Sequence, residues 1–296
     1  MLDISQYPNL KVNHQFFIKP DYLNHPIVSG NKLRKLKYNL IEAKNANKKV
    51  VLTFGGAYSN HISAMASAGQ LLGFKTVGVI RGEELASKIE RNATLTYAEH
   101  CGMELCFVTR EQYRNKTNAD FILELKKRYG DFYLVPEGGT NTLAVRGCEE
   151  ILTIQDKDYD YVCCSVGTGG TISGIINSAF PHQKILGFPA LKGDFLKEEI
   201  SKFVTRKNWE LITDYHFGGY GKVNHTLIHF INEFKRLHDI QLDPIYTGKM
   251  ILGITDLMGK KYFPKHAKIL AIHTGGLQGI TGINQRLIQQ GKPLIV

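Results

Sequence analysis

Apolar and polar positions along the chain follow two alternating patterns, one typical of buried strands and one typical of helices. Short apolar runs that end in glycine predict strands, and apolar residues three or four positions apart predict the helices between them. VVLTFGG at 50–56 and KTVGVIRG at 75–82 show the first pattern, and the segment between them predicts a helix over about 60–72. Strands that alternate with helices are typical of a parallel α/β fold.

The same alternation continues along the rest of the chain. A helical stretch is predicted over 88–101, in KIERNATLTYAEHC. Further strands are predicted in MELCFVTR (103–110), FYLVPEGG (132–139), YDYVCCSVGTGG (159–170), KILGFPAL (184–191) and KILAIHTGG (268–276). Because ligands bind at the carboxyl ends of strands in open α/β sheets, the glycine turns after these strands predict the rim of a site.

Length and composition are those of a globular protein. The 296 residues exceed a typical single domain and predict one large or two interlocked domains. No apolar run approaches the roughly 20 residues that span a bilayer, and the first residues do not resemble a secretory signal, so we expect a cytoplasmic enzyme without a membrane partner. Five cysteines without a C-x-x-C pair predict reduced thiols, with Cys163 and Cys164 in a buried strand.

The charge balance leaves several classes of partner open. The chain carries 37 basic and 27 acidic residues, a net charge of +10. Such a surface attracts nucleic acid, but equally phosphorylated cofactors and carboxylate substrates. The basic residues are scattered and no nucleic-acid-binding motif accompanies them, so we expect no nucleic-acid partner. His225 and His229 would share one helical face, as zinc ligands do, but no third ligand is evident nearby and we expect no metal.

The strongest signal for a bound anion is the turn in SVGTGGTISGI, at 165–175. A strand ends there and a helix begins directly after glycines, so free backbone N–H groups would point at a phosphate. The loop matches neither a Walker A motif nor a dinucleotide fingerprint, and a tight turn without a ligand is the alternative. The candidate phosphate-binding residues are Gly167, Thr168, Gly169, Gly170 and Thr171.

A second glycine turn leads to polar side chains. In FGGAYSNH, at 54–61, a strand and the turn are followed by Ser59, Asn60 and His61 at the start of a helix. Three polar side chains in this place would hold a carboxylate, although Ser and Asn also serve there as ordinary N-caps. HTGGLQGI, at 273–280, repeats the strand–glycine–helix arrangement.

Lys32 lies at the first turn of the amphipathic segment KLRKLKYNLIEAKNA. A helix N-terminus disfavours an ammonium group, so a lysine there loses its proton more readily and becomes a nucleophile, above all when it is desolvated. Lysines are mostly exposed, however, and a solvated surface lysine is the alternative interpretation from the residues alone.

Six motifs occur in order from Gly30 almost to the end of the chain. They are Gly30-Asn31-Lys32-x-Arg34-Lys35-Leu36-x-Tyr38, Gly55-Gly56-x-x-Ser59-Asn60-His61, Pro136-x-Gly138-Gly139-Thr140-Asn141, the loop 167–171, Asp243-Pro244-x-Tyr246-Thr247-Gly248-Lys249 and His273-Thr274-Gly275-Gly276. This series resembles the 1-aminocyclopropane-1-carboxylate (ACC) deaminase and D-cysteine desulfhydrase family of pyridoxal-5′-phosphate (PLP) enzymes. The segment before Lys32 departs from the family pattern, because Pro20 interrupts its Lys-Arg-Asp-Asp motif.

The resemblance implies a fold and a division into domains. The fold is that of the tryptophan synthase β chain (fold type II), an α/β fold with two open domains and mostly parallel sheets. A larger PLP-binding domain would comprise residues 1–43 and 146–296, and a smaller inserted domain would comprise 44–145. A homodimer is also implied.

The resemblance further implies roles for the candidate residues. Lys32 would carry PLP as a Schiff base, the loop 167–171 would hold the phosphate, and Asn60 would bond the ring hydroxyl. The substrate carboxylate would meet Ser59, Asn60 and His61, and Ser59 would also take part in catalysis. Tyr246 would face the reacting centre, assisted by Tyr220. PLP acts as an electron sink, so the protein must place the bond to be broken and tune the ring.

Two positions bear on the substrate, which we expect to be a small amino acid. ACC deaminases have Glu after the tyrosine of the Asp-Pro-x-Tyr motif and Leu in the His-x-Gly-Gly turn, whereas D-cysteine desulfhydrases have Thr at both. The chain has Thr247 and Thr274. A hydroxyl at the pyridine nitrogen would favour a neutral ring, a weaker sink that still supports loss of sulfide. We therefore expect α,β-elimination from D-cysteine, with ACC deamination as the alternative.

Overall fold

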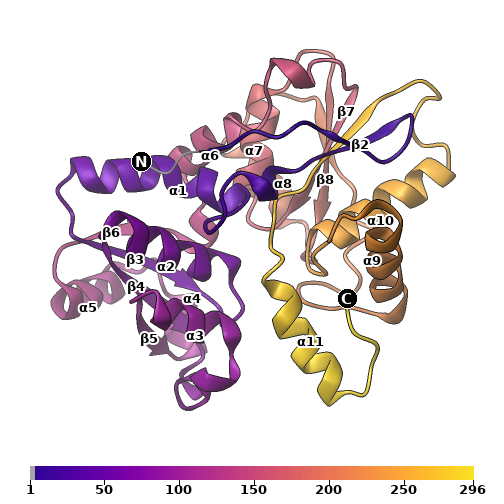
Figure 1. Ribbon diagram of the computed structural model, residues 1–296. Coiled ribbons are helices and arrows are strands. Elements are labelled where there is room, and N and C mark those ends of the chain that lie inside the picture. The colour runs from indigo at the N-terminus through magenta and orange to yellow at the C-terminus, as the bar shows by residue number, and fades with distance from the viewer. Residues whose placement is uncertain (1–3) are drawn as a thin grey trace.

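Two β-sheets organise the chain in a computed structural model, which describes residues 4–296 (Figure 1). The larger sheet has six strands in the order β1-β2-β10-β7-β8-β9, and all neighbours are parallel except β1 and β2. Its strands are β1 (Leu10–Lys11), β2 (Phe16–Lys19), β7 (Tyr161–Val166), β8 (Lys184–Pro189), β9 (Trp209–Leu211) and β10 (Ile269–Ile272). The predicted α/β class with mostly parallel strands is therefore confirmed.

The smaller sheet is wholly parallel and lies within residues 50–135, in the order β5-β4-β3-β6. Its strands are β3 (Val50–Gly55), β4 (Lys75–Arg81), β5 (Glu104–Val108) and β6 (Phe132–Val135). All four lie inside the segment 44–145 that was predicted as an inserted domain. The boundaries of that domain stay a prediction.

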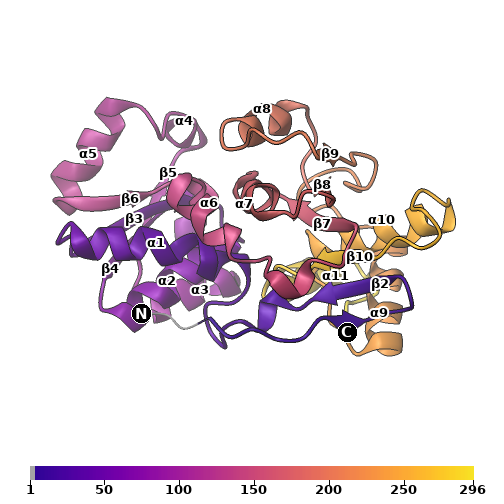
Figure 2. The same ribbon diagram turned by 90° about the horizontal axis from the view of Figure 1, so that it is seen from above.

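Helices cover both sheets and separate them. Figure 2 shows α6 and α7 between the two sheets, and α1 packs against α6. Among residues 4–296, no helix is long and apolar enough to cross a membrane. The helices are α1 (Asn31–Asn45), α2 (Asn60–Leu72), α3 (Ala93–His100), α4 (Arg110–Arg114), α5 (Ala119–Tyr129), α6 (Thr142–Glu149), α7 (Gly170–Ser178), α8 (Phe195–Ser201), α9 (His225–His238), α10 (Thr247–Gly259) and α11 (Gly279–Gln289).

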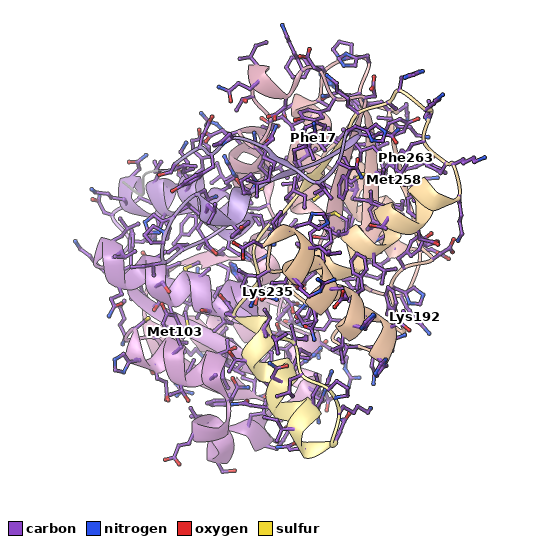
Figure 3. All side chains as sticks on the ribbon, turned by 45° about the vertical axis from the view of Figure 1, so that its right-hand side comes forward. Phe17, Met103, Lys192, Lys235, Met258 and Phe263 are labelled. Atoms are coloured by element: carbon purple, nitrogen blue, oxygen red, sulfur yellow. The ribbon has the colours of Figure 1, made fainter. Side chains whose placement is uncertain are left out.

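Each sheet has its own apolar core. Figure 3 shows Met103 among the elements of the smaller sheet, whereas Phe263 and Met258 lie on the far side, against the larger sheet. Cys163 and Cys164 are fully buried in β7, as predicted, and the five cysteines are all free thiols. The long apolar runs therefore became strands because both of their faces are covered.

One predicted helix and three strands differ from the prediction. The stretch 88–101 is not one helix: a 3₁₀ segment (Glu83–Arg91) ends at Asn92, whose side chain accepts a hydrogen bond from Leu95 N at 3.0 Å and starts α3. The larger sheet also contains β1, β2 and β9, which the pattern did not predict. These strands have two to four residues each, too few for a periodicity to show.

Candidate active site

A cavity of about 390 Å³ is lined by residues from both halves of the chain. The turns after β7 and β10 contribute to its wall because these neighbouring parallel strands end at the same edge of the larger sheet, and the turn after β3 contributes from the smaller sheet. The predicted site residues in this wall are Lys32, Ser59, Asn60, His61, Gly167, Thr168, Gly169, Thr171, Tyr220, Tyr246 and Thr274. Gly170 lies behind this surface, where an added Cβ would come within 3.0 Å of the Thr140 side chain.

Lys32 is positioned by the first turn of α1. The helix follows Gly30, whose backbone has φ 66° and ψ −149°, and the Asn31 amide donates to the Thr274 carbonyl at 3.2 Å. The Lys32 side chain lines the cavity, and burial lowers the pKa of its amine to about 8. A substantial fraction of the amine is therefore unprotonated near neutral pH, as a nucleophile requires.

Lys35 is a second amine at the same cavity, and the sequence reasoning gave it no role. Its Nζ donates to Gly138 O and Thr140 Oγ1, both at 2.8 Å, and to Thr168 Oγ1 at 3.3 Å. Burial and the nearby charge of Lys32 lower its pKa to about 7. The spacing of three residues from Lys32, which places both amines on one helical face, was the available signal.

The loop 167–171 forms a cradle at the start of α7. Gly169 has φ 87°, and a Cβ there would lie 3.1 Å from Ile200. A Cβ on Gly167 would lie 3.3 Å from the Tyr246 hydroxyl. The side-chain amide of Asn31 donates to Thr171 Oγ1 at 2.8 Å, which ties the loop to the helix that carries Lys32. Glycines and a helix N-terminus together suit an anion such as a phosphate.

The start of α2 combines a cap with an unpaired polar group. Ser59 is the N-cap, and its Oγ accepts from His61 N at 3.2 Å and Ile62 N at 3.4 Å. Ser59 therefore serves as an ordinary N-cap, which was the alternative to a binding role, and the same residue also lines the cavity. Asn60 Oδ1 is buried and has no hydrogen-bond partner among the described residues. A buried unpaired acceptor at a cavity wall points to a ligand that donates to it.

The hydrogen bonds of Thr53 define the tautomer of His61. Thr53 Oγ1 donates its only proton to Val135 O at 2.8 Å, so His61 Nε2, at 2.8 Å from Oγ1, must be the protonated nitrogen. Burial and the charges of Lys32 and Lys35 hold the imidazole pKa well below its usual value. The ring is therefore neutral, and its buried Nδ1, which has no partner among the described residues, offers a lone pair.

Tyr246 and Tyr220 form one wall of the cavity. Their ring centroids are 6.0 Å apart with an interplanar angle of 67°, and burial raises the pKa of both hydroxyls. Tyr246 precedes α10, where the Asp243 carboxylate accepts from Tyr246 N at 2.8 Å and Thr247 N at 2.7 Å. This carboxylate cap places the Tyr246 backbone directly at the helix start.

The two threonines used to assign the substrate have different surroundings. Thr274 lines the cavity, and its Oγ1 lies 3.5 Å from Ser165 Oγ. Thr247 does not line the cavity, because its hydroxyl donates to Asp243 Oδ2 at 2.6 Å within the helix cap. The expectation that Thr247 faces a bound ring is thus not supported by its contacts, and the assignment rests on Thr274.

Charged residues at the mouth of the cavity were also missed. Arg81 follows the smaller sheet at the end of β4, and Glu137 lies after β6. Glu137 is paired with Lys116 at 3.2 Å. Their positions after strand ends were the available signal. His225 and His229, the alternative metal ligands, are exposed on α9.

The donor set fits PLP, the cofactor that the resemblance implied. The glycine cradle and the Lys35 amine suit a phosphate, and the desolvated Lys32 amine suits an aldehyde. The unpaired Asn60 Oδ1 suits a hydroxyl donor. Anion, aldehyde and hydroxyl are three of the functional groups of PLP, and their candidate partners line one cavity.

Comparison with known proteins agrees with this donor set. A protein of Pyrococcus horikoshii, provisionally named an ACC deaminase, is 30% identical over 310 residues, covering 96% of this chain and 92% of its own. The mitochondrial bifunctional D-cysteine desulfhydrase/ACC deaminase of Arabidopsis thaliana is 29% identical and covers 92% of this chain and 75% of its own. The chain is thus related to proteins named for these two activities.

Solved structures share the fold. The crystal structure of an ACC deaminase homologue superposes with a TM-score of 0.83 at 27% identity, over 98% of this chain and 95% of the other. The O-acetylserine dependent cystathionine β-synthase of Helicobacter pylori has a TM-score of 0.69 at 14% identity, over 95% of each chain, and shows the fold alone. The family profile described as pyridoxal-phosphate dependent enzyme matches residues 4–275. The chain therefore belongs to the family of pyridoxal-phosphate dependent enzymes.

Proposed function

We propose that this enzyme catalyses α,β-elimination from a small amino acid, namely D-cysteine, to give pyruvate, ammonia and hydrogen sulfide. The observation that carries the proposal is that hydroxyl groups, and no unpaired carboxylate among the described lining residues, lie at the end of the cavity where Thr274 is found. Ser165 and Thr274 supply hydroxyls there, and among the described lining residues Glu137 is the one carboxylate, already paired with Lys116. A pyridine nitrogen beside hydroxyls stays neutral, so the site suits a substrate with a good leaving group.

The cofactor would be held by residues of α1, of α2, of the loop before α7 and of the turn after β10. Lys32 would bind its aldehyde, and Asn60 Oδ1 would accept from the ring hydroxyl. Lys35 would bind the phosphate together with Gly167, Thr168, Gly169, Gly170 and Thr171, and Thr274 would face the ring nitrogen. When bound, PLP supplies an electron sink for the charge that develops at the substrate Cα.

The substrate would lie between α2 and the tyrosine wall. Ser59 and the Asn60 amide would donate to its carboxylate, and the neutral His61 beside them would accept a hydrogen bond through Nδ1 from a donor group of the substrate rather than from the carboxylate. Tyr246, with Tyr220 beside it, would face the reacting centre. Lys32, released from the cofactor when the substrate binds, would take the Cα proton, because an amine with a pKa of about 8 is a competent base near neutral pH.

ACC deamination, which yields 2-oxobutyrate and ammonia, is the second candidate. The name of the Pyrococcus relative favours it, and the Arabidopsis relative is named for both activities. Both reactions need the same cofactor and the same Lys32, so they differ in the substrate pocket and not in the fold. The predicted homodimer is a separate proposal, which light scattering would test.

The test compares two products from one preparation. We expect sulfide release from D-cysteine to exceed 2-oxobutyrate formation from ACC in kcat/KM. Lys32→Ala should abolish both and remove the visible absorbance of the lysine-bound cofactor. Lys37→Ala, on the same helix but paired with Glu150, should leave both unchanged. Turnover of ACC alone would overturn the substrate assignment, and full turnover by Lys32→Ala would overturn the site.

A further inference from the structure

Lys249 is a buried amine to which the proposed function gives no role. It lies in the first turn of α10, three residues after Tyr246, and the residue is only 2% exposed. Burial lowers the pKa of its amine to about 8. It does not line the cavity. A lysine is costly to bury unless its N–H groups are paired, so the partners of Lys249 indicate why it is there.

Those partners are two backbone carbonyls of one loop. Lys249 Nζ donates to His216 O and to Gly219 O, both at 2.9 Å. The loop lies between β9 and α9. The same two carbonyls also accept from the loop's own amides, Gly219 N to His216 O at 3.0 Å and Lys222 N to Gly219 O at 3.2 Å. The amine is therefore bound at the centre of the turn.

The loop does not hold this shape by propensity alone. Phe217 has φ 53°, and Gly218, Gly219 and Gly221 have φ 90°, 113° and 64°. Three glycines in a short segment give the unfolded and open forms a large conformational entropy. A charged donor that bonds two of its carbonyls selects one shape from these alternatives, because such bonds are stronger than neutral ones.

Tyr220 follows Gly219 in this loop, and it lines the cavity with its ring packed edge-to-face against that of Tyr246. Tyr246 immediately precedes α10, and Lys249 lies in the first turn of that helix. The two bonds from Lys249 Nζ to His216 O and Gly219 O, here called the clamp, therefore connect the loop that carries Tyr220 to the rigid helix start that carries Tyr246. The geometry points to Lys249 as a positioning residue, which holds the 216–221 loop so that Tyr220 lies against Tyr246 at the reacting centre. The clamp is in the folded chain, whereas the role of Tyr220 at the reacting centre rests on the proposed function.

Hydrogen exchange tests the clamp without any turnover. In the cofactor-loaded Lys249→Met variant, the amides of Gly219 and Lys222 should exchange about tenfold faster or more, because a hydrogen bond to a charged group shifts a local opening equilibrium by that factor. Lys19→Met is the matched control. Lys19, on β2, is also buried, but its amine binds the Asp156 carboxylate at 2.7 Å and not the loop. It should lower stability and leave exchange in the loop unchanged.

Kinetics test what the clamp does. Lys249→Met should lower kcat roughly 10- to 100-fold, the scale of a misplaced reacting group, while KM changes little. In a Tyr220→Phe background the same change should have almost no further effect on kcat, because the hydroxyl it positions is already gone. A variant that only destabilised the fold would not show this loss of coupling.

Several results would overturn the inference. If hydrogen exchange in the 216–221 loop is unchanged in Lys249→Met, Lys249 does not hold the loop. If the effects of Lys249→Met and Tyr220→Phe on kcat multiply, Lys249 does not position Tyr220. If Lys249→Met does not fold, Lys249→Gln, which keeps an N–H donor near the same carbonyls, must show both results in smaller degree. If the wild type turns over neither D-cysteine nor ACC, the proposed function fails, and the exchange experiment still decides the clamp.

Discussion

Replacing Gly30 by alanine should destabilise the protein at the position that connects Lys32 to β10. Gly30 has φ 66° and ψ −149°, a region that side chains avoid, and an added Cβ would lie 2.0 Å from Thr274 O. Ordinary contacts to a Cβ begin near 3.4 Å, so the two backbone segments would have to separate by about 1.4 Å. That separation also breaks the bond from Asn31 N to Thr274 O.

Gly130 provides a control with almost the same backbone conformation. It has φ 76° and ψ −154° after α5, but nothing lies within 4 Å of an added Cβ. Both alanine variants therefore carry the same backbone strain, of about 1–3 kcal/mol. Gly30→Ala adds an overlap of about 1–3 kcal/mol and the loss of one hydrogen bond, of about 1 kcal/mol. The difference between the variants should be about 2–4 kcal/mol.

Urea unfolding of the two variants, followed by circular dichroism without added PLP, measures that difference. The affinity for PLP gives a second readout, because displacement of Thr274 disturbs the cavity wall whereas Gly130 does not line the cavity. Gly30→Ala should bind PLP more weakly than the wild type, and Gly130→Ala should bind it equally well. Equal stability losses in the two variants would refute the steric reasoning.

Three further predictions concern charge and capping. The rate at which the protein free of PLP takes up PLP should rise with pH around a midpoint near 8, because the lowered pKa of Lys32 yields the free amine above that pH; a midpoint near 10.5 would mean an exposed amine. Lys35→Met should weaken PLP binding by about 10- to 100-fold, the value of a charged hydrogen bond, whereas Lys37→Met should not, as titration of absorbance will show. Ser59→Ala should lower the free energy of unfolding by about 1 kcal/mol through loss of the N-cap and lower kcat/KM far more. A loss of kcat/KM no greater in proportion than the loss of stability would leave Ser59 with a structural role only.

The sequence predicted those elements whose signals are local. The helix expected over 60–72 is α2 to the residue, because Ser59 caps its first turn and Gly73, with φ 73°, ends it. The long apolar strands were equally clear. β2 and β9 were missed because each is short, and what makes them strands is a partner distant in the chain: β2 pairs with β10, and β9 pairs with β8.

The candidate site was predictable where chemistry follows a glycine turn. The residues of such turns gather because parallel strands end together. The spacing of three residues places Lys35 on the helical face of Lys32, but only the tertiary contacts with Gly138 and Thr140 show that its amine belongs to the site. The environment of Thr247 was misjudged for a similar reason, because the Asp243 carboxylate that binds its hydroxyl is a feature of the folded cap.

The pairing of β2 with β10 has a consequence for biosynthesis. Residues 16–19 pair in register with residues 269–272, so β2 cannot take its place beside β10 until residues 269–272 have been synthesised. The smaller sheet, whose strands lie within 50–135, is complete much earlier. Thr274 follows β10 in the chain, and the Gly30 backbone packs against its carbonyl. The cavity wall that carries Lys32 therefore cannot form before Thr274 has been synthesised. The cavity can therefore bind PLP only after Thr274 has been synthesised, and a product that terminates before this residue would have no complete cavity.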